Sequence, residues 1–304
     1  MSKIAFIYPG QGAQTPGMGK DFYENSQFAK DLYDRASKEL DLDLKALCFE
    51  KNEKLDVTEY TQAALVVTCL AMTRVFMEKT GIKPDLTAGL SLGEYCAIAV
   101  AGGLEDVDAV KLVRKRGILM EHAYPSGEGA MAAILGLDAE KVNEAIKDID
   151  GVSVANYNCP GQIVITGEKN SVQTGVDALK EAGAKRGILL NVSGPFHSPF
   201  LKEAGQELRK ELDQTNFHEL SIPYVTNVTA DYVHDIKETR GLLERQVSDS
   251  VCWQQSMEKM IADGVDTFYE IGPGKTLNGF LRKINRDIKV INIAKWEDVE
   301  NGIQ

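Results

Sequence analysis

Residues 86–103 read LTAGLSLGEYCAIAVAGG, and this stretch decides how the rest of the chain is interpreted. It predicts a short apolar strand ending at Thr87-Ala88, a tight turn over residues 89–93, and an apolar helix from about Glu94. Strand, G-x-S-x-G turn and helix in this order form a nucleophile elbow, in which glycines permit the sharp bend that exposes a serine hydroxyl. Ser91 is therefore the candidate nucleophile, beside helix N-terminal N–H groups that can stabilise an oxyanion.

The same letters have a structural alternative. Ser91 and Glu94 are spaced as S-x-x-E, a capping box in which the serine caps the helix and the glutamate bonds back to the serine N–H. Five loosely specified letters recur by chance, so the pentapeptide alone leaves both interpretations open. The rest of the chain has to decide between them.

Composition and charge limit the class of protein. The chain has 304 residues, 43% of them hydrophobic, which is enough for one large or two smaller domains. Its apolar runs are shorter than the ~20 residues of a membrane span, and no export signal opens it. Five scattered cysteines without metal-ligand spacing indicate a reduced cytoplasmic protein with no metal site. A net charge of -11 argues against nucleic acid as a partner.

Alternating strands and helices surround the elbow. Residues 3–8 form an apolar strand, and the turn Pro9-Gly10-Gln11-Gly12 after it exposes backbone N–H groups to a ligand. A helix opening near Asp56 is apolar nearly all round and ends at Gly81, as expected of a core helix. The remaining predicted elements are helices over residues 20–47, 106–122, 200–213, 236–247 and 254–263, strands over 221–228, 267–271 and 289–293, and a frayed acidic end. Ser198 is the predicted N-cap of the helix over 200–213.

A compact unit interrupts this pattern between about residues 129 and 192. Six elements follow one another as βαββαβ, with residues 158–161 as the hairpin turn between the second and third strands. That order is the ferredoxin-like split unit. We therefore predict an α/β fold in which a hydrolase-like large domain with a parallel-sheet core, residues 1–126 and 193–304, carries an inserted small subdomain over residues 127–192.

Two glycine-rich turns resemble nucleotide-binding motifs without completing them. The G-x-G of residues 10–12 would need its third glycine at Thr15, and no acid-tipped second strand follows at a suitable distance. The Gly-Lys-Thr of residues 274–276 would need a glycine where Tyr269 stands. Neither turn therefore supports a nucleotide cofactor.

A serine nucleophile needs a base, and the chain offers four histidines. His122 ends a helix, and His218 and His234 lie among polar residues. His197 differs because it stands between Gly/Pro turn residues and a helix start, where the chain re-enters the large domain. His197 is therefore the predicted base, although no single Asp or Glu stands out as the third member of a triad.

Motifs spread over almost the whole chain resemble the malonyl-CoA:acyl carrier protein transacylase family, the acyltransferases of fatty-acid synthesis. The residues that carry the resemblance are Pro9-Gly10-Gln11-Gly12 with Gln14, Tyr60-Thr61-Gln62, Gly89 to Glu94, Arg116-Gly117, Asn156 to Gly161, Phe196-His197, Gln246, and Glu270 to Gly274. Several separated motifs in the right order are more specific than any one of them.

The resemblance implies a covalent mechanism. Ser91 would attack the malonyl thioester and carry the acyl group, which the phosphopantetheine thiol of acyl carrier protein would then accept, and His197 would act as base and then acid. The resemblance also implies that a backbone carbonyl at Gln246 orients the histidine and that N–H groups of Gln11 and Leu92 form the oxyanion hole. Coenzyme A thioester and carrier protein are then substrates, with no cofactor and no membrane. The expected pocket residues are Gln62, Asn156 and Phe196.

Arg116 has a physical role of its own in this scheme. Malonyl ends in a carboxylate, and burying that charge unpaired would cost several kcal/mol. A guanidinium accepts it with two parallel hydrogen bonds, which favours malonyl over acetyl donors. The alternative is a surface arginine on a basic helix face. The chain departs from the family at Leu90, where the family usually has histidine, which leaves the mechanism intact and the tuning of the pocket open.

Other functions remain compatible with the same residues. Water as the acceptor would make the protein a thioesterase, a polyketide pathway would make it a trans-acting acyltransferase, and a non-catalytic module would only bind carrier protein or acyl-CoA. Because carrier proteins are acidic, docking requires a local basic patch. The candidate residues are Lys111, Arg114, Lys115, Lys185, Arg186 and Arg282.

Overall fold

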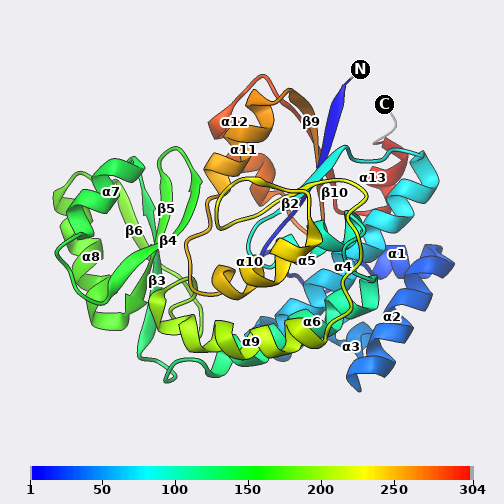
Figure 1. Cartoon of the computed structure of the whole chain (residues 1–304), viewed down its shortest axis with the longest axis horizontal. Helices are drawn as coiled ribbons and strands as arrows, with labels where there is room; N and C mark the ends of the chain where they lie inside the picture. The colour runs from blue at the N-terminus through cyan, green and yellow to red at the C-terminus, as the bar shows by residue number, and fades with distance from the viewer. Residues whose placement is uncertain (1, 302–304) are drawn as a thin grey trace.

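The computed structural model describes residues 2–301 and contains two sheets (Figure 1). The larger sheet has the strand order β10-β9-β1-β2-β7-β8, in which β8 alone runs antiparallel to its neighbour. Its strands are β1 (Lys3–Tyr8), β2 (Leu86–Gly89), β7 (Tyr224–Val225), β8 (Tyr232–Val233), β9 (Val265–Ile271) and β10 (Lys289–Ile293). The predicted α/β fold with a parallel-sheet core is confirmed.

The strand register brings two glycine turns together. Tyr8 at the end of β1 pairs with Gly89 at the end of β2, so the turns after both strands leave the sheet at the same edge. The carboxyl ends of neighbouring parallel strands are where α/β sheets bind ligands. The sheet therefore places residues 9–12 beside the predicted elbow.

Helices cover both faces of the large sheet. They are α1 (Lys20–Asn25), α2 (Gln27–Leu40), α3 (Leu44–Phe49), α4 (Thr58–Thr80), α5 (Gly93–Val100), α6 (Asp106–His122), α9 (Lys202–Gln214), α10 (Thr239–Gln246), α11 (Trp253–Ala262), α12 (Thr276–Ile284) and α13 (Trp296–Asn301), with short 3-10 turns η1 (Lys54–Asp56), η2 (Pro199–Leu201) and η3 (Ile236–Glu238). Within residues 2–301, α4 is the one helix long and apolar enough to span a bilayer, and 83% of its apolar window is buried. It packs between α2 and α6 as a core helix, as predicted.

The predicted helix over residues 20–47 is wrong, because local capping divides it into three. Extended Ser26 accepts a hydrogen bond from the Ala29 N–H and starts α2. Asp41 adopts a left-handed φ of 48° and ends α2. Asp43 then accepts from the N–H groups that open α3. These boundaries are therefore decided by side-chain oxygens that accept from backbone N–H groups in place of the i→i−4 hydrogen bonds of a continuous helix.

Other predicted elements also differ in extent. The strand over 221–228 is reduced to the two residues of β7, and the helix over 236–247 begins as η3. Ser198 occupies the N-cap position of η2 (Pro199–Leu201), as predicted, but its side chain makes no capping hydrogen bond, because its hydroxyl donates to the Pro195 carbonyl. The predicted frayed end contains α13, where the Trp296 ring meets Phe22 edge-on at 5.7 Å. Residues 302–304 of the acidic end lie outside the described residues.

The small antiparallel sheet forms a separate subdomain, at the left of Figure 1. Its elements are β3 (Gly129–Leu135), α7 (Ala139–Ile146), β4 (Val152–Cys159), β5 (Gln162–Glu168), α8 (Lys169–Glu181) and β6 (Arg186–Leu189). The order β4-β5-β3-β6 confirms the predicted ferredoxin-like unit. Its hairpin turn is tighter than predicted, because Asn158 and Cys159 belong to β4. The N–H and C=O of Val251, in the segment between α10 and α11, bond to Ala155 and Tyr157 of β4 and link the subdomain to the large domain.

Candidate active site

The elbow forms because two glycines let backbones approach closely. A Cβ at Gly89 would lie 1.9 Å from the carbonyl carbon of Gly93, and one at Gly93 would lie 2.3 Å from the Tyr8 oxygen. Ser91 between them has a left-handed φ of 50°, which is strained for a residue with a side chain. The Ser91 N–H is held by the Asn227 Oδ1 at 2.6 Å. The bend therefore turns the hydroxyl away from the start of α5.

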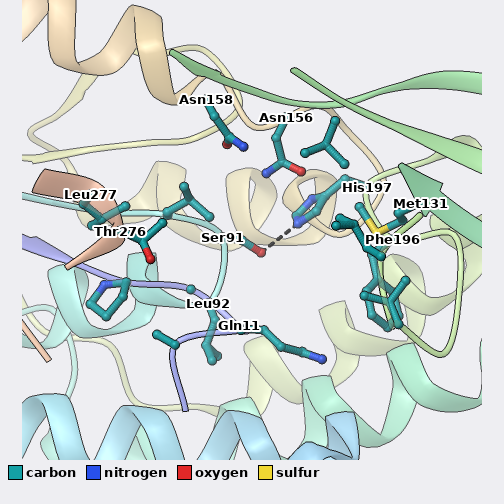
Figure 2. A pocket seen from close by; sticks show the side chains of 18 of the residues that line it. Gln11, Ser91, Leu92, Met131, Asn156, Asn158, Phe196, His197, Thr276 and Leu277 are labelled. Atoms are coloured by element: carbon teal, nitrogen blue, oxygen red, sulfur yellow. Dashed lines mark hydrogen bonds between the residues drawn. The ribbon is translucent and has the colours of Figure 1, made fainter. Parts of the chain in front are cut away.

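The capping-box alternative is wrong. No side-chain hydrogen bond caps α5. The Ser91 hydroxyl lies 2.7 Å from His197 Nε2 (Figure 2). Glu94 accepts hydrogen bonds from Gln246 and Asn227 instead. The predicted nucleophile and the predicted base, 106 positions apart, are thus in hydrogen-bond contact.

His197 is held in one tautomer. Its Nδ1 lies 2.8 Å from the Gln246 backbone carbonyl, which can only accept, so Nδ1 carries the proton and Nε2 is free to accept one from Ser91. Burial, and then the Arg116 charge, lower the pKa of His197 to about 4. The imidazole is therefore neutral above that pH, and a carbonyl stands where serine hydrolases place a carboxylate.

Arg116 is buried beside both groups, with 1% of its surface exposed. Its Nη1 donates to Gln62 Oε1 at 2.8 Å, and its Nη2 donates to Gln246 Oε1 at 3.0 Å and to Ser91 Oγ at 3.2 Å. Gly117 lets α6 approach α4, because a Cβ there would lie 2.9 Å from the Glu59 Cα. Arg116 is thus no surface residue, although Lys115 directly before it is exposed.

The side chain of Gln246 joins these groups, which the sequence did not indicate. Its Nε2 donates to the Ser91 carbonyl at 2.9 Å and to Glu94 Oε2 at 2.6 Å, while its Oε1 accepts from Arg116. The family resemblance implied a role for its backbone carbonyl alone. One glutamine therefore orients the nucleophile, the base and the guanidinium together.

The Ser91 hydroxyl opens into a cavity of about 260 Å³ (Figure 2). Gln11 and Leu92 lie on the wall below it, and their backbone N–H groups donate no hydrogen bond within the described residues. Two unpaired N–H groups beside a nucleophile are what an oxyanion hole requires. The wall also contains Arg116, His197 and two predicted pocket residues, Asn156 and Phe196.

Gln62 is the exception among the predicted pocket residues. It lies behind the cavity wall and contacts Arg116 instead. The cavity has further, mostly apolar walls. These residues are Leu90, Met131, Asn158, Val164, Leu190, Val192, Thr276, Leu277 and Phe280.

The basic face of α6 is paired with acids. Lys111 lies 3.3 Å from Glu39, and Lys115 lies 3.9 Å from Glu211. Arg114 pairs with Glu59, its guanidinium carbon 4.4 Å from the Tyr60 ring centre. This face is therefore less available to an acidic partner than its composition suggests. No cluster of three or more metal-ligating residues occurs among residues 2–301.

The chain is similar to known proteins over almost its whole length. A family model described as acyl transferase domain matches residues 5–296. The malonyl CoA-acyl carrier protein transacylase of Bacillus subtilis is 47% identical over 100% of this chain and 97% of its own, and that of Staphylococcus aureus is 43% identical over 99% and 98%.

Solved structures agree as well. A malonyl CoA-acyl carrier protein transacylase from Clostridium perfringens superposes with a TM-score of 0.95 at 40% identity, covering 99% of this chain and 96% of that one. A type II PKS acyl-carrier protein in complex with its malonyl-transacylase gives a TM-score of 0.96 at 37% identity, covering 99% of each chain. Both likenesses extend over the whole fold.

Proposed function

The chain belongs to the acyl transferase family, and we propose that it moves a malonyl group from malonyl-CoA to the phosphopantetheine thiol of acyl carrier protein, supplying fatty-acid synthesis. The observation that carries the malonyl assignment is the buried guanidinium of Arg116, 3.2 Å from the candidate nucleophile. An acyl group attached to Ser91 brings its far end into this cavity, and a carboxylate there meets a charge of opposite sign.

In the first half-reaction Ser91 Oγ attacks the thioester carbon as its proton passes to His197 Nε2. The negative charge that develops on the carbonyl oxygen is stabilised by the N–H groups of Gln11 and Leu92. The tetrahedral intermediate then expels the coenzyme A sulfur, which takes the proton from His197. The product is a malonyl ester of Ser91 and free coenzyme A.

The second half-reaction repeats these steps with a different thiol. The phosphopantetheine thiol gives its proton to His197 and attacks the ester, and the proton returns to Ser91 Oγ as the serine leaves. The Gln246 carbonyl stabilises the imidazolium that forms between the two transfers. Because the ester must wait for a carrier, water has to be kept from it, and the mostly apolar cavity walls favour this.

The assignments that complete the proposal concern the chain's surroundings. We place the protein in the cytoplasm, where reduced thiols and its thioester substrates occur together. No cofactor is needed beyond these substrates. We place the small subdomain at residues 127–192, which the span from β3 to β6 supports.

One experiment separates the proposal from a thioesterase. The protein is incubated with malonyl-CoA and phosphopantetheinylated carrier, and the products are identified by mass spectrometry. The proposal expects malonylated carrier. Free malonate as the only new product, with unmodified carrier, identifies a hydrolase instead.

A further inference from the structure

Glu94 is a buried carboxylate to which the mechanism above gives no role. It lies at the start of α5, three residues after the nucleophile, and is fully inaccessible to solvent. A buried carboxylate is costly unless it is paired or protonated. Its contacts therefore require an explanation.

All the hydrogen bonds that reach Glu94 from its partners end on one oxygen. Oε2 accepts from Gln246 Nε2 at 2.6 Å and from the Asn227 N–H at 3.2 Å. These two residues in turn hold the catalytic groups, since Asn227 fixes the Ser91 amide and Gln246 orients His197 and Arg116. Oε1 has no hydrogen-bond partner within the described residues. A proton on Oε1 would thus leave both bonds in place.

Among residues 2–301, one charged group acts on Glu94. The titratable and charged groups that act on it are Arg116 from α6, Tyr224 from β7 and Tyr95 from its own helix. Burial raises the pKa of both tyrosines, which stay neutral. Arg116 and an ionised Glu94 are then a buried cation and anion joined through the amide of Gln246.

A malonyl carboxylate adds a second anion beside Arg116. When it pairs with Arg116, two anions share one buried cation, and like charges in a desolvated site raise the pKa of the weaker acid. Burial already raises the pKa of Glu94 to about 7, partly offset by the hydrogen bonds from Gln246 and Asn227, by the neighbouring Thr226 hydroxyl and by the Arg116 charge. An acetyl group carries no charge and leaves the pKa of Glu94 unchanged.

We infer that Glu94 is a positioning residue that holds Gln246 against Arg116 and His197, and that it takes up one proton when a carboxylate-bearing acyl group pairs with Arg116. The inference rests on the proposed function, because it requires a malonyl donor. The proton comes from solvent and adds to Oε1. The acyl transfer itself moves the Ser91 proton to the coenzyme A thiol and adds no proton of its own.

Proton uptake during malonyl loading tests this inference. The protein is mixed with malonyl-CoA in weak buffer at pH 7.5, and an indicator reports protons while intact mass reports the acyl groups loaded. Glu94 with a pKa of about 7 is mostly ionised at this pH, so the expected uptake is about 0.5 to 0.8 proton per malonyl group. Acetyl-CoA, which releases the same thiol, should give no such uptake.

Two variants make the result specific. Glu94→Gln places an amide where the protonated acid would be and keeps an acceptor for Gln246, so its proton uptake should vanish. Glu270→Gln is the matched control: Glu270 is also fully buried, but it accepts from the N–H groups of Leu277 and Asn278. Its uptake per malonyl group should equal that of the parent.

A pH profile separates positioning with proton exchange from a merely structural role. The parent's kcat/KM for malonyl-CoA should fall about tenfold between pH 7 and 8.5, as Glu94 ionises. Glu94→Gln should lose this fall and raise the malonyl-to-acetyl ratio at pH 8, whereas Glu94→Ala, which releases Gln246, should lower loading with both donors.

The outcomes distinguish this inference from the function on which it rests. Failure of the parent to form any acyl-enzyme overturns the proposed function. An acyl-enzyme that forms with no proton uptake, or with equal uptake in Glu94→Gln, overturns the inference and leaves the function standing. A uniform loss with both donors in Glu94→Gln, with the parent's pH profile, also overturns it.

Discussion

Replacing Arg116 by alanine should change which acyl donor the protein accepts. The guanidinium is buried and already held by Gln62 and Gln246, so its orientation costs little when a carboxylate arrives. Removing one partner of a buried charge pair costs about 3–5 kcal/mol. At about 1.4 kcal/mol per factor of ten, kcat/KM for malonyl-CoA should fall by a factor between about 10² and about 4 × 10³.

The same change should affect acetyl-CoA much less. An acetyl group has no carboxylate, so the loss is confined to the 3.2 Å contact between Arg116 and Ser91 Oγ, about 1 kcal/mol. The acetyl-to-malonyl ratio should therefore rise by the remaining difference of about 2–4 kcal/mol, which is about 30- to 700-fold. Loading is measured by intact mass after timed exposure to each donor, and thermal unfolding checks the fold.

Arg114→Ala provides the matched control for this prediction. It lies two positions away on α6, its side chain is 18% exposed, and it pairs with Glu59 outside the cavity. Its donor ratio should equal that of the parent. Should Arg116→Ala keep the parent's ratio while remaining folded, the pairing of Arg116 with the donor carboxylate is refuted.

Further predictions concern the base and the elbow. Loading should be lost as the pH falls through about 4, because His197 becomes protonated and cannot accept the serine proton. Arg116→Ala removes a positive charge that repels the imidazolium, so it should raise the pKa of His197 and move the loss of acetyl loading to higher pH. Gly89→Ala should destabilise the fold by more than about 4 kcal/mol, since the added Cβ would lie 1.9 Å from the Gly93 carbonyl carbon. Gly241→Ala has open space around the added Cβ and should cause no such loss. Chemical denaturation measures the free energy of unfolding of both variants. Asn227→Ala should cost about 1–3 kcal/mol of stability by leaving the elbow's N–H without its acceptor, and an unchanged unfolding midpoint would contradict this.

Local sequence signals identified the elements that depend on neighbouring residues. The apolar pattern and Gly81 gave the core helix α4, and the glycine spacing gave the bend at Ser91. The succession of strand and helix segments in the inserted unit predicted its six elements in the observed order. Such features are set by backbone geometry and burial within a short window, which a single sequence contains.

The connections between distant segments could not be read in the same way. Glu94 fits a capping box by spacing, and only the fold shows its oxygen on Gln246, 152 positions later. Gln62 was expected in the cavity, but it lies behind Arg116, because side-chain direction on a buried helix depends on what packs against it. A buried polar network is settled by tertiary packing, and its members look alike in sequence.

The most direct test of the covalent mechanism is the intact mass of the protein after exposure to malonyl-CoA, compared between the parent and Ser91→Ala. A malonyl ester of Ser91 predicts one malonyl group on the parent, its removal by phosphopantetheinylated carrier protein, and no modification of the variant. A parent that stays unmodified while transfer to carrier still proceeds, or a variant that is malonylated equally well, would contradict the covalent mechanism at Ser91.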